Sequence, residues 1–230
     1  MSHERIAATF DEWARSGQGE GLEDGHGDVV SQVVPRMEIK PGMQTLDLGC
    51  GTGWATRQLA AAAPGAGAIG TDVSPEMIAK AEALHDLTSR ARYERGTFEA
   101  IDFNDGKFDR VFSMEALYYA VDLTQAVGEI HRVLKPGGVA HVVVNRFAES
   151  KHSEGWSESV GLDMAFLSVE EWAQLFQGAG FASVETERLL DSRGPGDEAT
   201  FQPSPHCPDH ATARELHEAG SLWIRATKEA

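Results

Sequence analysis

The stretch LDLGCGTGWAT, residues 46–56, decides the fold that this sequence predicts. A short apolar run that carries an acidic residue is followed by three glycines at alternate positions. After a strand, glycines let the backbone approach a ligand without interference from Cβ atoms, and the helix that follows offers free N–H groups at its start. The stretch therefore indicates a ligand-binding loop between a strand and a helix.

The glycine spacing argues against two common nucleotide-binding loops. Counted from Gly49, the last position of the dinucleotide pattern G-x-G-x-x-G falls on Trp54, and counted from Gly51 it falls on Thr56. A phosphate-binding P-loop does not fit either, because the glycines are not followed by the lysine and hydroxyl residue which that loop requires.

The pattern that remains is Asp47-x-Gly49-x-Gly51-x-Gly53, with Asp72 at the end of the next predicted strand. An acidic side chain at that second position accepts hydrogen bonds from a ribose diol. Asp47 has two interpretations, because its carboxylate could contact the ligand or could order the glycine loop. The pattern predicts a ligand that contains a nucleoside.

Strand-like and helix-like segments alternate along the chain from this loop onward, which indicates parallel βαβ units. The basic turn 135–138 precedes the fifth strand. We expect strands at 45–48, 67–71, 91–95, 108–113 and 138–145, with helices at 53–63, 75–86 and 122–134 between them.

The flanking segments are less regular. Residues 1–40 are interpreted as an N-terminal lid and helix, in which the glycine-rich residues 17–27 form a loop and Asp28 caps a helix. Residues 41–230 then form the main domain, with an irregular insertion at about 147–167. Beyond the insertion we expect a helix at 168–178, a strand at 181–190, a short helix around 209–218 and a strand at 221–227.

The chain is strongly acidic. Among its 230 residues, 36 Asp and Glu oppose 20 Lys and Arg, which gives a formal net charge of −16. A negative field repels polyphosphates, so we expect no tight binding of the chain alone to nucleic acid or to an anionic membrane. An acidic excess also suits a halophilic protein, because self-repulsion is screened over about 3 Å at 1 M salt.

Cysteine usage and hydropathy favour a soluble cytoplasmic protein. The two cysteines, Cys50 and Cys207, provide no disulfide framework. The first residues are charged and lack an apolar leader, and no stretch approaches the roughly 18 apolar residues of a membrane span.

Four motifs in order, LDLGCGTG, GTDVSPEMI, KFDRVFSMEALYY and EIHRVLKPGG, resemble the class I S-adenosylmethionine-dependent methyltransferases. They extend over roughly residues 40–146. The resemblance implies a single Rossmann-like domain, a doubly wound sheet of seven strands that is mostly parallel with an antiparallel last strand. It implies methyl transfer with S-adenosyl-L-methionine as the cofactor.

The resemblance also implies which residues bind the cofactor. The glycine loop would hold the methionine and ribose, Asp72 the ribose hydroxyls, and Val73 and Met77 the adenine. Thr97 and Phe98 depart from the family pattern, in which Asp and a small residue are usual. The full set implied is Asp47, Gly49, Cys50, Gly51, Gly53, Asp72, Val73, Met77, Phe98, Glu99 and Ser113.

Residues for the methyl acceptor are expected after the fourth strand and in the two irregular segments. Glu115 is a base, a substrate anchor or a helix cap, and Tyr118 and Tyr119 are pocket walls or core residues. Further candidates, each of which could instead be a surface or packing residue, are Trp13, Glu20 and His26 in the lid, and His152 and Trp156 in the insertion.

No metal site is expected. His206, Cys207 and His210 lie close together in the sequence, but a structural zinc site needs four ligands and no fourth is nearby.

The third strand, from Ala91 to Arg95, would lie at an edge of the sheet in this fold, and an exposed edge can pair with another chain. Some archaeal and eukaryotic relatives associate there with a small zinc-binding activator, so the resemblance implies a possible heterodimer through this strand. Protection of the edge by its own Arg and Glu side chains is the alternative.

The methyl acceptor is left open between a small or amphipathic molecule and a translation component such as tRNA, rRNA or a release factor. Two alternative functions are a nucleotide-dependent oxidoreductase and a non-catalytic cofactor-binding subunit. The first predicts NADH binding, and the second predicts cofactor binding without turnover.

Overall fold

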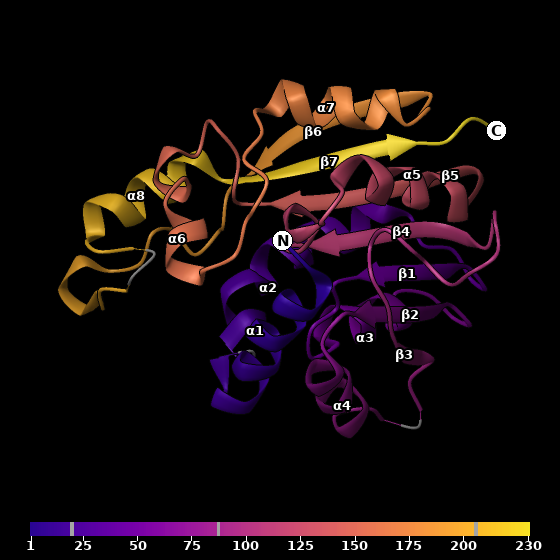
Figure 1. Ribbon diagram of the computed structural model, residues 1–230, viewed down its shortest axis with the longest axis horizontal. Coiled ribbons are helices and arrows are strands. Elements are labelled where there is room, and N and C mark those ends of the chain that lie inside the picture. Colours follow the sequence, from indigo (N-terminus) through magenta and orange to yellow (C-terminus); the bar gives the residue numbers. More distant parts are fainter. Residues whose placement is uncertain (19–20, 87, 205–206) are drawn as a thin grey trace.

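The computed structural model describes residues 1–18, 21–86, 88–204 and 207–230. Within them, one seven-stranded sheet has the order β3-β2-β1-β4-β5-β7-β6 (Figure 1). The strands are β1 (Gln44–Leu48), β2 (Gly67–Asp72), β3 (Ala91–Arg95), β4 (Phe108–Met114), β5 (Leu134–Val144), β6 (Ser183–Leu189) and β7 (Ser221–Thr227).

The sheet confirms the expected fold class. Strands β1 to β5 are parallel, and β7 lies antiparallel between β5 and β6. The third strand lies at one edge of the sheet, as expected, and β6 forms the other. The chain order reverses between β1 and β4, and ligands bind at such a switch point beyond the carboxyl ends of the strands.

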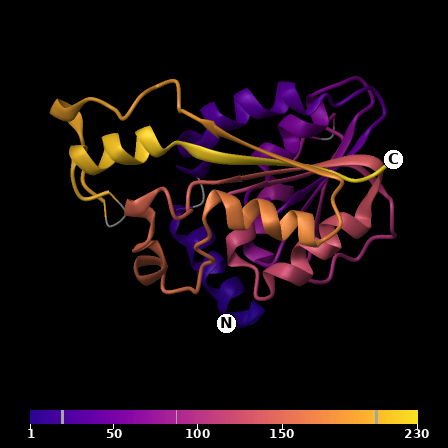
Figure 2. The same cartoon turned by 90° about the horizontal axis from the view of Figure 1, so that it is seen from above.

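Helices cover both faces of the sheet (Figure 2). On one face, α5 (Leu123–Val133) and α7 (Val169–Gly178) bury apolar residues such as Ile130 and Trp172. On the other face, α2 (Gly21–Val33), α3 (Trp54–Ala61) and α4 (Pro75–Ala83) pack with the short 3-10 helix Val34–Met37. The doubly wound arrangement leaves the strand ends as the place for a site.

The remaining helices lie beyond the strand ends toward which β1 and β4 point (Figure 1). They are α1 (His3–Ser16), α6 (Trp156–Val160) and α8 (His210–Ala219). Three further 3-10 turns span Leu117–Tyr119, Lys151–Ser153 and Glu198–Thr200.

The predicted glycine-rich loop at 17–27 was wrong, because α2 already begins at Gly21. Glycine lowers helix stability by about 1 kcal/mol per residue, and burial of Val29, Val30 and Val33 offsets that cost. Asp28 is therefore no N-cap. Position 28 lies in the middle of α2, and the Asp28 carboxylate accepts hydrogen bonds from the backbone N–H and the hydroxyl of Ser192. Residues 19 and 20, including the candidate Glu20, lie outside the described residues.

The predicted turn at 135–138 was also wrong in part, because β5 starts at Leu134 and runs through it. The pairing of β4 with β5 shifts register between Phe108 and Arg110, and Gly137 takes a φ of 71°. An irregularity of this kind accommodates the extra residues without ending the strand.

Candidate functional site

A cavity opens beyond the carboxyl ends of β1, β2 and β4. It is lined by segments that extend from α1 to the insertion before α7. Of the residues predicted for the site, it brings together Asp47, Gly49, Cys50, Gly51, Asp72, Val73, Met77, Phe98, Glu99, Glu115, Tyr118, Tyr119 and Trp156, together with Trp13 and His26.

The glycine loop after β1 leaves open space at only one of its three glycines. A Cβ at Gly49 would meet Ala116 at 2.3 Å, and one at Gly53 would meet the Tyr93 ring at 2.4 Å. At Gly51, which has a φ of 51°, nothing lies within 4 Å of that position. The first and third glycines are thus required by packing, whereas Gly51 keeps its backbone accessible from the cavity.

The loop is fastened to β2 by backbone and carboxylate contacts. The N–H groups of Gly49 and Cys50 donate to the carbonyl of Thr71 at 2.8 and 3.0 Å. The N–H of Gly51 donates to Oδ2 of Asp72 at 2.9 Å, and Oδ1 of Asp72 accepts from the N–H of Ser74 at the same distance. Burial raises the pKa of Asp72, although these backbone donors oppose the rise.

Asp47 orders the loop from beneath and also reaches the cavity. Its Oδ2 accepts a hydrogen bond of 2.6 Å from the hydroxyl of Thr56, which lies in the first turn of α3. This contact joins the strand before the loop to the helix after it. Burial raises the pKa of Asp47 to about 7. Burial likewise raises the pKa of the neighbouring Cys50 thiol well above its usual range, so Cys50 lines the cavity as a neutral thiol.

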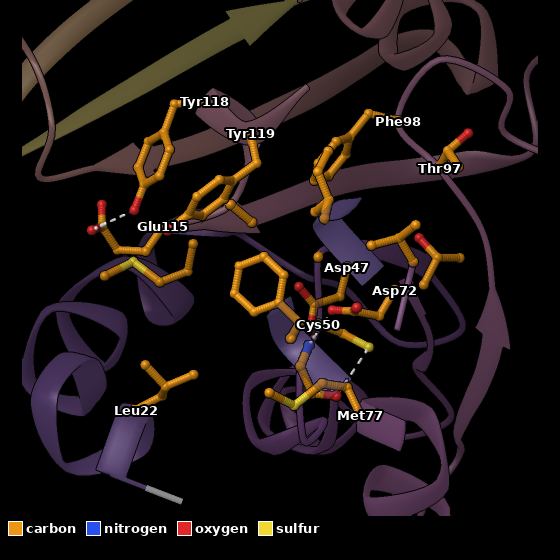
Figure 3. A pocket seen from close by; sticks show the side chains of 18 of the residues that line it. Leu22, Asp47, Cys50, Asp72, Met77, Thr97, Phe98, Glu115, Tyr118 and Tyr119 are labelled. Atoms are coloured by element: carbon orange, nitrogen blue, oxygen red, sulfur yellow. Dashed lines mark hydrogen bonds between the residues drawn. The ribbon is translucent and has the colours of Figure 1, made fainter. Parts of the chain in front are cut away.

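The apolar side chains of Met77 and Phe98 lie on the same side of the cavity as Asp72, together with Thr97 (Figure 3). Met77 comes from the first turn of α4, which Ser74 caps by accepting from its N–H at 3.0 Å. An apolar slot next to a carboxylate that can accept from a diol could hold an adenosine.

Glu99 holds the segment after β3 in place. Its Oε1 accepts from the N–H groups of Val121 and Asp122, and its Oε2 lies 2.7 Å from Nε2 of His3. The carboxylate thereby joins α1 to the wall of the cavity.

Glu115 and Tyr118 form a hydrogen-bonded pair on the opposite side of the cavity (Figure 3). The Tyr118 hydroxyl donates to Oε2 of Glu115 at 2.9 Å, and the N–H of Asn145 donates to Oε1. Glu115 has a φ of 53°, a conformation uncommon for residues other than glycine. Burial raises the pKa of Glu115 to about 7, and burial also raises the pKa of Tyr119.

Residues missed by the sequence analysis cover this second side. Ile6 and Phe10 lie one helical turn apart on α1, and Leu22 extends the cover from α2. Phe10 packs edge-to-face on Tyr119 with ring centroids 5.1 Å apart. The apolar spacing of residues 6, 10 and 13 is the helical signal that could have identified α1.

Three predicted site residues lie outside the cavity lining. The Ser113 hydroxyl is buried and donates to the carbonyl of Leu48 at 2.9 Å. Gly53 accommodates Tyr93. His152 turns away and pairs with Glu215 on α8, with Nε2 and Oε2 2.6 Å apart.

In the part of the chain that the structure describes, no group of three or more His, Cys, Asp or Glu side chains is arranged to hold a metal ion. His210 faces the carbonyl of Gly196 at 3.0 Å, and Cys207 packs near Asp209. His206 lies outside the described residues. No helix within those residues is long and apolar enough to cross a membrane.

Comparison with known proteins identifies the family. A family described as "Methyltransferase domain" matches residues 46–142. A Haloferax volcanii methyltransferase, solved in complex with the Trm112 methyltransferase activator, is 33% identical over 96% of this chain and 98% of its own, with a TM-score of 0.88. This chain belongs to the S-adenosylmethionine-dependent methyltransferase family. S-adenosylmethionine, expected from the motifs, is the cofactor of this family.

Curated relatives of this methyltransferase act on different kinds of acceptor. A sterol 24-C-methyltransferase of Aspergillus fumigatus is 29% identical over 78% of this chain and 50% of its own length. A malonyl-[acyl-carrier protein] O-methyltransferase of Erwinia billingiae is 34% identical over 60% of this chain and 52% of its own. The chain thus spans about half the length of these relatives, and their names divide between carbon and oxygen acceptors.

Proposed function

We propose that this protein transfers a methyl group from S-adenosylmethionine to an acceptor that binds in the same cavity. The observation that carries the proposal is the open backbone at Gly51, hydrogen-bonded to Asp72 beside an apolar slot. A nucleotide-dependent oxidoreductase is disfavoured, because neither glycine frame matches the dinucleotide fingerprint.

The cofactor assignments follow from the two sides of the cavity. Asp72 would accept from the ribose hydroxyls, since each of its oxygens has a lone pair beyond the one used by a backbone N–H. Val73, Met77 and Phe98 would enclose the adenine, and Gly49, Cys50 and Gly51 would follow the ribose and methionine portion. Asp47 would hold the loop and face the amino-acid end of the cofactor.

Bound S-adenosylmethionine supplies an electrophilic methyl group on a sulfonium. The residues of this chain then need mainly to position the acceptor, because a well-oriented pair of reactants needs little further acid or base chemistry. Tyr118, Tyr119 and Glu115 stand on the side of the cavity opposite the adenosine slot, where the acceptor would be held (Figure 3).

The proposal is tested by calorimetric titration with S-adenosylmethionine, S-adenosylhomocysteine and NADH. Micromolar binding of the first two and no binding of NADH is expected. Binding of NADH alone, or of none of the three by folded protein, would overturn the cofactor assignment.

We also propose that a small zinc-binding activator pairs with the edge strand β3. The support is the exposed edge itself, on which Arg92, Glu94 and Arg95 point to solvent, and the similarity to a methyltransferase that was solved with Trm112. A chain added at this edge would gain main-chain hydrogen bonds.

Hydrogen exchange measures that contact directly. With Trm112 of Haloferax volcanii added, amides of β3 should exchange more slowly, while those of β6, at the opposite edge, serve as the internal control. Unchanged exchange in β3 within a complex that forms would place the partner elsewhere.

A further inference from the structure

The cavity has two halves, and the half away from the adenosine slot has a different chemistry. Figure 3 shows Asp72 and Met77 on one side and Glu115, Tyr118 and Leu22 on the other. Asp47 and Cys50 lie between the two groups. The half beyond them, called here the acceptor chamber, is bounded by Tyr118, Tyr119, α1, α2 and α6.

Apolar side chains cover the acceptor chamber on the side of α1 and the insertion. Ile6, Phe10 and Trp13 line it from α1, with the rings of Phe10 and Trp13 edge-to-face at 5.2 Å between centroids. Trp156 and Val160, one helical turn apart on α6, line it from the insertion. A chamber bounded in this way favours a ligand with a large apolar surface.

Polar contacts hold α1 over the chamber at three points. His3 pairs with Glu99, Arg5 donates to the carbonyl of Gly161 at 2.6 Å, and Asp11 accepts from the Ser74 hydroxyl at 2.6 Å. These contacts tie α1 to the wall, to the end of α6 and to the start of α4. A compact molecule bound beneath α1 would leave these three contacts in place.

The Glu115–Tyr118 pair is the main polar feature inside the acceptor chamber, and the neutral imidazole of His26 is a second polar group in its cover. Each carboxyl oxygen of Glu115 accepts one hydrogen bond from the protein and keeps a lone pair for another. A ligand that presents an O–H or N–H group to this wall of the chamber can therefore donate to Glu115 while both protein contacts stay in place.

We infer that the methyl acceptor is a compact, largely apolar molecule that presents one O–H or N–H group to Glu115. This rests on the proposed function, and it extends that function to a substrate class. The charge of the protein agrees with it, since a chain with a net charge of −16 repels the phosphates of an RNA acceptor.

1-Naphthol serves as the probe, and naphthalene, which has the same rings without the hydroxyl, is its matched control. Each is titrated by calorimetry into protein saturated with S-adenosylhomocysteine. 1-Naphthol should bind at least about tenfold more tightly than naphthalene, as expected for one hydrogen bond to a carboxylate. Equal affinity, or no binding of either molecule, would overturn the inference.

Variants locate the contact. Glu115→Gln should remove most of the preference for 1-naphthol over naphthalene and leave the affinity for S-adenosylhomocysteine unchanged. The control variant is Glu158→Gln, which replaces an exposed glutamate on α6 and should change neither quantity. If Glu115→Gln does not fold, Tyr118→Phe replaces it, with a smaller loss expected. If the folded variant keeps its preference for 1-naphthol over naphthalene, the proposed contact with Glu115 is ruled out.

Competition separates this inference from the proposed function. Purified tRNA should not displace 1-naphthol, and displacement would show that the chamber accepts a macromolecule. Failure of S-adenosylhomocysteine to bind at all would instead count against the cofactor assignment, because that titration precedes the probe.

Discussion

The backbone N–H of Gly51 donates a hydrogen bond of 2.9 Å to the carboxylate of Asp72, which joins the glycine loop after β1 to the end of β2. The two residues are 21 positions apart in the sequence. Because the carboxyl ends of adjacent parallel strands lie side by side, this single contact orients both elements toward the same cavity.

Replacement of Asp72 tests the ribose assignment. Asp72→Ala should weaken S-adenosylhomocysteine binding by about one to two orders of magnitude, since a hydrogen bond to a charged group contributes about 1.5 to 3 kcal/mol. Calorimetry gives the affinity, and Asp102→Ala, at an exposed position outside the cavity lining, is the control. An unchanged affinity in folded protein would rule out the assignment.

Gly51 and Gly42 form a matched pair for testing the open loop. Both have a positive φ, of 51° and 81°, and in both nothing lies within 4 Å of a built Cβ. Gly51→Ala and Gly42→Ala should therefore each lower stability by about 1 kcal/mol. Only Gly51→Ala should lose cofactor affinity, because only Gly51 lines the cavity. Similar affinities in the two variants would mean that the ligand does not approach Gly51.

The pH dependence of turnover should report Glu115. An acceptor with an O–H or N–H group loses its proton as it gains the methyl group, and in the inferred binding mode the Glu115 carboxylate, which lines the cavity, would take that proton. Burial raises the pKa of Glu115 to about 7, so the rate should rise as the pH increases through about 7. Rates of methyl transfer to a bound small acceptor, measured from pH 5.5 to 8.5, should lose this rise in Glu115→Gln.

Acid should destabilise the fold through His141. This residue is buried against Trp223, and within the described residues neither of its ring nitrogens has a hydrogen-bond partner. Burial, with Arg110 and Arg225 nearby, lowers the pKa of His141 to about 3. Since its pKa is about 6.5 in the unfolded chain, the neutral folded form loses stability as the pH falls below that value.

Between pH 7 and pH 5, titration of His141 should lower the free energy of unfolding by at most about 2 kcal/mol, at about 1.4 kcal/mol per pH unit below pH 6.5. In urea unfolding, His141→Phe should show a correspondingly smaller loss over this interval. His26, whose pKa burial lowers to about 4, contributes in both proteins and therefore cancels in the comparison. Identical pH dependences would show that His141 does not titrate on unfolding.

Salt should stabilise this protein. The net charge of −16 makes self-repulsion in the folded state substantial, and 1 M salt screens charges beyond about 3 Å. We therefore expect the urea midpoint to rise between 0.1 M and 2 M potassium chloride, as for a halophilic protein. A falling midpoint would show that ion pairs such as Arg36–Glu187 outweigh the net repulsion.

The order of strands and the family were predictable because their signals are local. The glycine loop follows β1 and Asp72 ends β2, two strands that the alternation of apolar segments already placed, and β3 was correctly expected at an edge. The second half of α2 was expected as a helix, but its first half was predicted to be a loop, since three glycines argue against a helix there and packing of Val29, Val30 and Val33 stabilises it. The cofactor and acceptor assignments of single residues stay predictions.

The sequence by itself determined the βαβ order, the glycine loop and the acidic residue at the end of β2, because strand, turn and helix signals act over a few neighbouring residues. Only the tertiary structure decided what covers the acceptor chamber. Phe10, Leu22 and Trp156 come from segments far apart in the chain, and long-range packing brings them over Glu115. In the same packed structure, Ser113 and His152 lie outside the cavity lining. The Ser113 hydroxyl donates to the carbonyl of Leu48, and His152 pairs with Glu215.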